Sequence, residues 1–543
     1  MKLKFESNRG ITLIALVITI IILLILVGVT IATLMGDNGL INRANDAKIA
    51  TEIASIKEEI QTDILSEQAG NNGNISDDTL KGILEKYGVL SEEEKLIDKT
   101  LTTTKGNHEI KVADIFNGTT VKDVPKNPVL ADKSGASTPN LNKIAQKTYV
   151  TWNLNETGTE YVINDTQTTQ PDNWYDYENG KWANIKTTNN GLEAYWVWIP
   201  RYEYKITSTS VSQIDVRFIG TDKKEGATGY ITQSDGTVKS SDGYTIHPAF
   251  TNTGNGGFGE LDGIWVAKFE ASSNTEAPDT NYGGGEPTTE NLLKVQVKPG
   301  VQSWRKISAN NIFKVCRKMT DSGEVLEGST VDSHMMKNTE WGAVAILSQS
   351  KYGIFNSQSN IENPTDGSNR RIWNNPNGYN SGKYIYTGYV GNSADASPTY
   401  SSKVAPTNVI EYNKKNTSGL DGTKASTTGT VYGVYDMAGG SWEYVAGVLK
   451  GNSTDGSKDL DYATLKFNIT NQGKPEGMTD LNFAKKYLDL YNYRTSSTDY
   501  SQYIIGDATV ETKGWNSDYS YFVSSSSPVF VRGRWLQQWH DCR

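Results

Sequence analysis

An uncharged apolar run near the N-terminus constrains this chain more than any other feature. Residues 11–35 (ITLIALVITIIILLILVGVTIATLM) contain no acidic or basic side chain. A helix of this length, at about 1.5 Å per residue, exceeds the roughly 30 Å hydrocarbon core of a bilayer. Lys2, Lys4 and Arg9 precede the run, so residues 1–9 are expected in the cytoplasm and the rest outside. The sequence predicts a single-pass membrane protein with an extracellular C-terminal domain, because the run is also longer than a signal peptide's.

The junction before the run carries a second signal. Arg9 and Gly10 are followed directly by Ile11 and the apolar helix. This arrangement resembles the processing site of type IV prepilins. The resemblance implies a prepilin peptidase as partner, with cleavage after Gly10 and methylation of Ile11. Ala15 stands where the family has a glutamate that pairs inside the filament core, which argues against polymerisation.

Composition excludes several classes of function. The chain has 53 Lys and Arg against 62 Asp and Glu, a net charge of −9, whereas a nucleic-acid partner requires clustered basic residues. Four histidines and two cysteines in 543 residues argue against a Cys/His zinc site and a disulfide scaffold. We therefore expect no metal site and no cofactor, although a structural calcium at an unassigned place stays open.

Five parts are predicted along the chain. They are a leader (1–10), a transmembrane helix (11–35), a helical stalk (36–123), a linker (124–145) and a large domain (146–543). In the stalk, isoleucines at 49, 53, 56, 60 and 64 form an apolar helical stripe. A second helix is expected over residues 77–95, capped by Ser76. Three prolines and many small polar residues mark the linker.

Apolar and aromatic segments in the large domain predict strands separated by polar loops. The candidates are Thr148–Trp152, Ala194–Ile199, Tyr202–Ile206, Gly263–Glu270 and Val529–Arg532. The segments YWVWIPR and IWVAKFE are expected to pair. An amphipathic helix is predicted to begin at Asn338, with Thr339 as a candidate cap.

The order of these segments, with the turn VYDMAGGSWEY (434–444) and a late Val-Arg-Gly, is similar to the formylglycine-generating enzyme family. That family is a subclass of the C-type-lectin fold. The matching residues are Tyr435, Asp436, Met437, Gly439, Trp442, Glu443, Arg532 and Gly533. Gly440 and Tyr444 stand where the family has Asn and Trp. The resemblance implies an α+β fold class, with the transmembrane or pilin-like helix followed by a C-type-lectin-like domain with irregular loops.

The catalytic chemistry of that family is not expected here. Its oxidase branch uses a close cysteine pair to bind copper, and a soft thiolate pair suits Cu(I). The cysteines of this chain are Cys316, in an apolar-basic segment, and Cys542, at the C-terminus. Cys316 is predicted to be a buried small apolar residue. The chain is therefore predicted not to be an enzyme.

The fold subclass is also displayed by variable proteins of diversity-generating retroelements, in which residues after the Arg-Gly strand bind the ligand. Here the corresponding residues are Arg534, Trp535, Gln537, Gln538 and Trp539, which become candidate ligand contacts. This tail differs in composition from the Asn- and Ser-rich sequence before it. We therefore expect a one-base shift near codon 534, or an assembly error there, which would restore an Arg-Gly-Gly continuation and means that the large domain is truncated or frameshifted at its C-terminus. The contact residues apply if the tail is authentic, and an unstructured terminus is the alternative.

The function predicted from these observations is non-covalent recognition of an extracellular protein or glycan by a surface-displayed domain, which a retroelement could diversify. A minor pilin or pseudopilin that carries an adhesin domain is the first alternative. A formylglycine-generating-enzyme-like oxidase is the second.

Overall fold

The structure is a computed structural model of the whole chain. It describes residues 48–49, 51–53, 55–57, 59–64, 67, 77–92, 99–115, 134–171, 173–208, 213–257, 259–274, 284–288, 292–354, 372, 375, 385–391, 409–496, 502–512 and 522–533. The predicted leader, the apolar run 11–35, most of the linker and the tail after Gly533 lie outside these residues. The chain divides into two compact units, Met1–Leu130 and Ala131–Arg543, with the division inside the segment expected to be a linker.

The first unit packs helices against a small sheet. Residues 48–64 are helical wherever they are described, and the predicted stripe is confirmed, because Ile56, Ile60 and Ile64 are buried. They share a core with α3 (Asp77–Tyr87), α4 (Val112–Ile115) and the antiparallel strands β1 (Gly88–Leu90), β2 (Thr100–Thr103) and β3 (Glu109–Lys111). The helix expected over 77–95 ends at Tyr87. The chain then continues as β1, which pairs with β2. A Cβ atom at Gly88 would lie 2.1 Å from the Thr102 carbonyl oxygen, so this close approach requires glycine.

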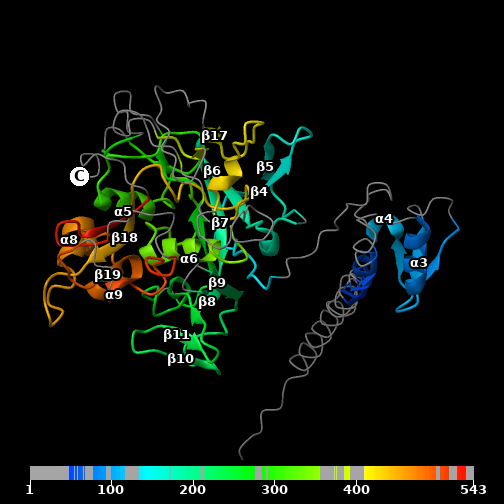
Figure 1. Cartoon of the computed structure of the whole chain (residues 1–543), viewed down its shortest axis with the longest axis horizontal. Helices are drawn as coiled ribbons and strands as arrows, with labels where there is room; N and C mark the ends of the chain where they lie inside the picture. Colours follow the sequence, from blue (N-terminus) through cyan, green and yellow to red (C-terminus); the bar gives the residue numbers. More distant parts are fainter. Residues whose placement is uncertain are drawn as a thin grey trace, which may run out of the picture. The chain divides into compact units, whose positions relative to one another are not determined.

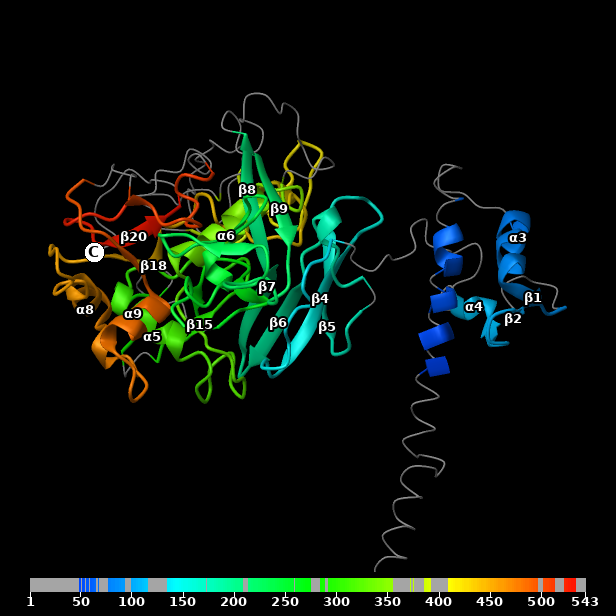
Figure 2. The same cartoon turned by 90° about the horizontal axis from the view of Figure 1, so that it is seen from below.

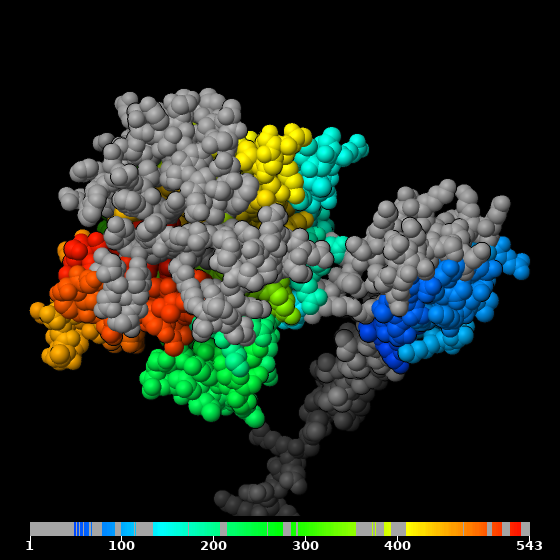
Figure 3. All heavy atoms as spheres, viewed as in Figure 1, coloured from blue at the N-terminus to red at the C-terminus, as the bar shows by residue number. Residues whose placement is uncertain are grey.

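Two five-stranded antiparallel sheets are the largest sheets described in the second unit (Figure 1). The first has the order β13-β7-β6-β4-β5 and comprises β4 (Lys147–Leu154), β5 (Tyr161–Gln167), β6 (Asn184–Asn189), β7 (Leu192–Pro200) and β13 (Gly263–Ala267). The second has the order β10-β11-β12-β8-β9 and comprises β8 (Tyr202–Ser208), β9 (Gln213–Phe218), β10 (Tyr230–Thr232), β11 (Val238–Ser240) and β12 (Thr245–Ile246). Figure 3 shows the β10–β11 segment in green on the surface of this unit.

A third sheet has the order β19-β18-β20, with β18 (Glu443–Leu449) parallel to β19 (Asp489–Tyr491) and antiparallel to β20 (Val529–Arg532). Two strand pairs complete the sheets: β14 (Ser272–Ser273) with β15 (Val295–Gln296), and β16 (Tyr389–Val390) with β17 (Ile410–Glu411). The helices of this unit are α5 (Ala309–Arg317), α6 (Asn338–Ser348), α8 (Asp461–Phe467) and α9 (Asp480–Tyr487). Short 3-10 turns are η3 (Tyr177–Asn179), η4 (Pro248–Phe250), η6 (Gly422–Ala425) and η7 (Ile469–Asn471).

The predicted strands are confirmed. Each candidate lies within or overlaps β4, β7, β8, β13 or β20, and the segments YWVWIPR and IWVAKFE pair through β7 and β13, with Trp198 opposite Trp265. Strand β7 is buried on both faces for most of its length. Its aromatic and β-branched residues therefore pack against neighbours on either side of the sheet.

The helix predicted at Asn338 is confirmed as α6, but its predicted amphipathic character and its cap are wrong. Every residue from Asn338 to Ser348 is buried. The helix lies in the interior against β9, β18 and η4 (Figures 1 and 2). Thr339 does not cap it. The Thr339 N–H instead donates to the Asp489 carboxylate of β19 at 2.7 Å.

The predicted α+β class is also corrected, whereas the predicted membrane-spanning helix 11–35 lies outside the described residues. The described part of the chain is mostly β sheet, and α5, α6, α8 and α9 contain only 7 to 11 residues each. None of the helices among the described residues is long and apolar enough to cross a bilayer. That class followed from the resemblance, whereas strands make up more of the second unit than helices do.

Candidate functional site

The turn 434–443 and the strand β20, which are far apart in the sequence, meet in the third sheet. Glu443 lies opposite Arg532, and Tyr444 lies opposite Val531. Gly533 follows with a φ of +87°, and a side chain there would approach the Ser441 carbonyl oxygen to 3.1 Å. A glycine suits this position for both reasons. We call the turn together with β20 and Gly533 the turn–strand site.

Asp436 is the centre of the turn. It adopts a φ of +62° and is buried. Its carboxylate accepts hydrogen bonds from the Glu270 N–H at 3.2 Å, the Gly388 N–H at 2.9 Å and the Asn375 amide at 2.8 Å. Burial raises the pKa of Asp436 to about 6, although these donors oppose the shift. The side chain thereby joins three separate segments of the chain.

Glu270 lies beneath the same turn. It accepts the Ser441 N–H at 3.0 Å and the Ser303 hydroxyl. Burial raises the pKa of Glu270 well above its usual value, and the nearby carboxylates of Glu443 and Asp436 add to the shift. A side chain at Gly440 would come within 2.6 Å of the Glu270 carboxylate, and Gly440 has a φ of +69°. This contact accounts for glycine where the resembling family has asparagine.

A buried lysine supports the turn from the other side. The Lys268 ammonium donates to the carbonyl oxygens of Val431 at 2.8 Å and Gly433 at 2.7 Å. It also lies 4.7 Å from the ring centre of Trp152. Burial lowers the pKa of Lys268 well below its usual value. Tyr435 stacks on Phe269 at a centroid distance of 5.6 Å, so the turn rests on a packed aromatic layer.

Arg532 fastens β20 to the buried helix. Its Nε donates to the Asn338 side-chain oxygen at 2.8 Å, and its guanidinium also donates to the Asp507 carbonyl. The guanidinium carbon lies 4.2 Å from the ring centre of Trp341. This buried arginine therefore positions the strand that leads to the C-terminal tail.

The structure brings together the motif residues that the sequence predicted. Met437 is buried, Trp442 and Glu443 are half-buried, and Gly439 has a φ of +79°. The sequence-based interpretation missed Lys268, Glu270 and Asn375. A signal for two of them was present, since Lys268 and Glu270 interrupt an otherwise apolar segment (IWVAKFE).

The other predicted site residues cannot be placed. Gly10 and Ile11 lie outside the described residues, and so do the candidate ligand contacts Arg534, Trp535, Gln537, Gln538 and Trp539. The predicted role of Cys316 is partly met. Cys316 lies half-buried on α5, and burial raises the pKa of its thiol to about 12. The thiol is therefore protonated at neutral pH.

The two buried carboxylates of the turn–strand site join separate segments of the chain. The carboxylates of Asp436 and Glu270 accept hydrogen bonds from the chain itself. Within the described ranges, no group of three or more His, Cys, Asp or Glu side chains is placed to hold a metal ion.

A hollow of about 530 Å³ lies beside α8, and none of its lining residues belongs to the turn–strand site. Its walls are Gly456, Ser457, Asp459, Leu460, Asp461, Thr464, Leu465 and Leu481. Leu465 is 71% exposed. This hollow was not anticipated from the sequence.

Comparisons with known proteins add no family to these observations. No protein-family model, curated protein or solved structure matches the chain.

Proposed function

We propose that the protein is a non-catalytic, surface-displayed binding protein that recognises an extracellular protein or glycan. One observation supports this proposal most directly. Arg532, directly before Gly533, is anchored by its hydrogen bond to Asn338. The chain continues from Gly533 into the proposed contact residues, which are Arg534, Trp535, Gln537, Gln538 and Trp539. A rigid scaffold that carries an aromatic-containing segment is a common arrangement for recognition.

The proposal places the protein at a membrane, attached through the apolar segment 11–35. That part rests on the sequence alone. The non-catalytic interpretation rests on the sequence, in which Cys316 and Cys542 lack the close spacing of the copper-binding cysteine pair in the resembling family. The resemblance of the turn to the formylglycine-generating enzyme family is retained as part of the proposal.

A binding screen with the full chain tests this proposal. The protein, in detergent micelles, is applied to arrays of bacterial and host glycans and of extracellular proteins. The double variant Trp535→Ala/Trp539→Ala is compared with Leu465→Ser, a variant at the hollow. We expect a saturable interaction that weakens at least about tenfold in the double variant and is unchanged in Leu465→Ser.

Two results would contradict the proposal. Binding that survives the double variant but disappears in Leu465→Ser would move recognition to the hollow beside α8. Thiol-dependent oxygen consumption by copper-loaded protein, abolished in Cys316→Ser, would support the oxidase. Sequencing the 3′ end of the gene across its source population separately tests diversification, which requires substitutions concentrated after codon 533.

A further inference from the structure

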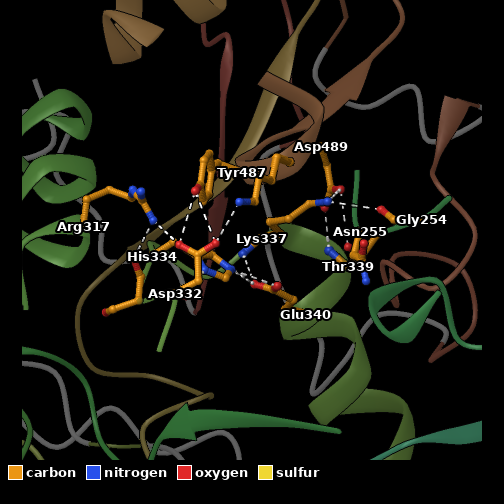
Figure 4. A network of polar contacts seen from close by, with 12 residues as sticks. Gly254, Asn255, Arg317, Asp332, His334, Lys337, Thr339, Glu340, Tyr487 and Asp489 are labelled. Carbon is orange, nitrogen blue, oxygen red and sulfur yellow. Dashed lines mark hydrogen bonds and ion pairs between the residues drawn. The ribbon is translucent and has the colours of Figure 1, made fainter. Parts of the chain in front are cut away.

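His334 lies in the segment 332–337 that leads into α6, and both of its ring nitrogens face hydrogen-bond acceptors (Figure 4). Nδ1 lies 2.8 Å from the Asp332 carbonyl oxygen. Nε2 lies 3.0 Å and 3.3 Å from the two carboxylate oxygens of Glu340. A carbonyl and a carboxylate only accept, whereas a neutral imidazole carries one N–H. Both hydrogen bonds therefore exist only when His334 is the imidazolium cation.

The charges around His334 favour that cation. The Glu340 carboxylate faces it from α6, and Asp332 faces it from its own segment. Asp332 is in turn paired with Arg317 of α5 and with Lys486 of α9, whose ammonium lies 3.1 Å away. Burial lowers the pKa of His334, but Glu340 and Asp332 together outweigh it and raise the pKa above its usual value.

Further contacts of this segment complete the surroundings of the imidazole. The Tyr487 ring of α9 lies edge-on to it, with a centroid distance of 5.7 Å. The Lys337 N–H donates to Glu340 at 2.8 Å, so the same carboxylate binds both the imidazole and the start of α6. The Lys337 ammonium is paired with Asp489 of β19 at 3.2 Å. These are the charged groups that the structure places around the segment.

The segment is also attached to the third sheet. The Met336 carbonyl oxygen accepts the Ala446 N–H of β18 at 2.8 Å. Strand β18 begins at Glu443, directly after the turn of the turn–strand site. The position of segment 332–337 is therefore linked, through packed backbone, to the turn–strand site.

We propose that His334 is a proton switch that closes the segment 332–337 over the first turn of α6 when protonated and loosens it when deprotonated. Loss of the proton removes one N–H, so either Asp332 or Glu340 loses its hydrogen bond. Because the folded state binds the proton more tightly than the unfolded state, this stabilisation is complete below the unfolded pKa of about 6.5. It is lost as the pH rises through the higher folded pKa.

Nitrogen NMR of the full chain, with ¹⁵N-histidine labelling, tests the protonation state directly. Only His108, His247, His334 and His540 contribute signals, and His334→Gln assigns one of them. At pH 6.5, we expect both nitrogens of His334 to be protonated. His247 serves as an internal reference, because burial lowers its pKa to about 3 and it stays neutral. A single neutral tautomer of His334 at pH 6.5 would overturn the proposal.

Hydrogen exchange followed by mass spectrometry tests the mechanical consequence. Peptides covering 332–340 and 443–449 should lose about tenfold in protection between pH 6 and pH 8.5, after correction for intrinsic exchange. Glu340→Gln should bring the His334 titration back towards its ordinary range. His108→Gln, in the first unit, is the matched control, because His108 also contacts a carboxylate, Glu52, at 3.1 Å. An unchanged pH profile in His334→Gln would contradict the switch.

Discussion

The helix over residues 48–64 and the helix α6 are built on different principles. The first presents isoleucines to the core of its unit and polar side chains elsewhere, so its sequence has a clear helical period. Helix α6 is buried from Asn338 to Ser348, and the polar residues of its first turn are buried with the rest. The capping carboxylates at its start are Asp489, from a strand far along the chain, and Glu340.

This difference shows when the spacing of apolar residues does not predict how a helix is packed. In a helix with one solvent-exposed face, the apolar residues recur with the helical period. Their spacing therefore predicts which face packs on the core. A helix surrounded by protein has no solvent-exposed face. Its polar residues form hydrogen bonds with partners that the local sequence does not predict. Hydroxyl residues usually cap helices, so the sequence indicates Thr339 as a cap, yet the Thr339 N–H is itself capped by the Asp489 carboxylate.

Removing the cap of α6 should have the largest effect. Lys337 is buried, with a residue exposure of 1%. Asp489→Ala leaves its ammonium with the carbonyl oxygens of Gly254 and Lys485 as described acceptors. An uncompensated buried charge costs about 3–5 kcal/mol, which hydrogen exchange of α6 peptides would measure as lost opening free energy.

The control for that prediction lies in the first unit. Lys86→Ala removes an exposed ion pair with Asp63 at 3.6 Å and should change stability by less than about 0.5 kcal/mol. Equal losses in the two variants would contradict the contrast between the two regions.

Adding one methyl group to α6 should also be costly. A Cβ at Gly342 would lie 2.0 Å from the Gly506 carbonyl oxygen, which is backbone and cannot move aside easily. We therefore expect Gly342→Ala to destabilise the second unit by about 2–3 kcal/mol, despite the better helix propensity of alanine. Chemical denaturation followed by tryptophan fluorescence would detect the loss. A neutral effect would mean that the 502–512 segment does not pack on α6.

The carboxylate of Glu511 makes the stability of the second unit depend on pH. Its carboxylate accepts the Gly506 N–H at 2.7 Å, and burial together with Asp507 raises its pKa to about 7. The folded pKa lies above the unfolded value of about 4.3, so stability falls as the pH rises between these values. Glu511→Gln should remove this loss and stabilise the second unit at pH 8 by roughly 1–3 kcal/mol.

The Glu511 and His334 effects have the same sign, so they must be separated. Thermal unfolding of Glu511→Gln, His334→Gln and the double variant at pH 5 and pH 8 does this. Glu511→Gln that is no more stable than the parent at pH 8 would show that Glu511 is not held protonated in the fold.

The last prediction is a small stabilisation of the first unit, opposite in sign to the effect of Gly342→Ala. Gly82 lies exposed in the middle of α3, and a side chain there would meet nothing within 4 Å. Gly82→Ala should stabilise the first unit by about 0.5–1 kcal/mol, because alanine favours helix and restricts the unfolded chain. Hydrogen exchange of the α3 peptides would report slower exchange. With Gly342→Ala, it forms a matched pair in which the same substitution in a helix has opposite consequences.

Local chemistry sufficed to predict the elements with a simple environment. The isoleucine stripe, the strands around Trp198 and Trp265, and the existence of a helix at Asn338 all follow from period and side-chain type. The motif residues from Tyr435 to Glu443 and Arg532 with Gly533 were also selected from the sequence, and the fold brings them to one place. The α+β class, which followed from the resemblance, was wrong, because the described part of the chain is mostly β sheet with few helices.

Tertiary structure alone decided which polar groups became partners. The Lys268 ammonium donates hydrogen bonds to carbonyl oxygens of the loop 431–433. Glu270 lies beneath Gly440, and Asp489 caps α6. A buried charge is tolerated only where hydrogen-bonding groups surround it, and those groups come from distant segments. The protonation of His334 has the same origin. The sequence determined which side chains could ionise. The packing of α5, α6 and α9 around segment 332–337 determined that His334 is charged.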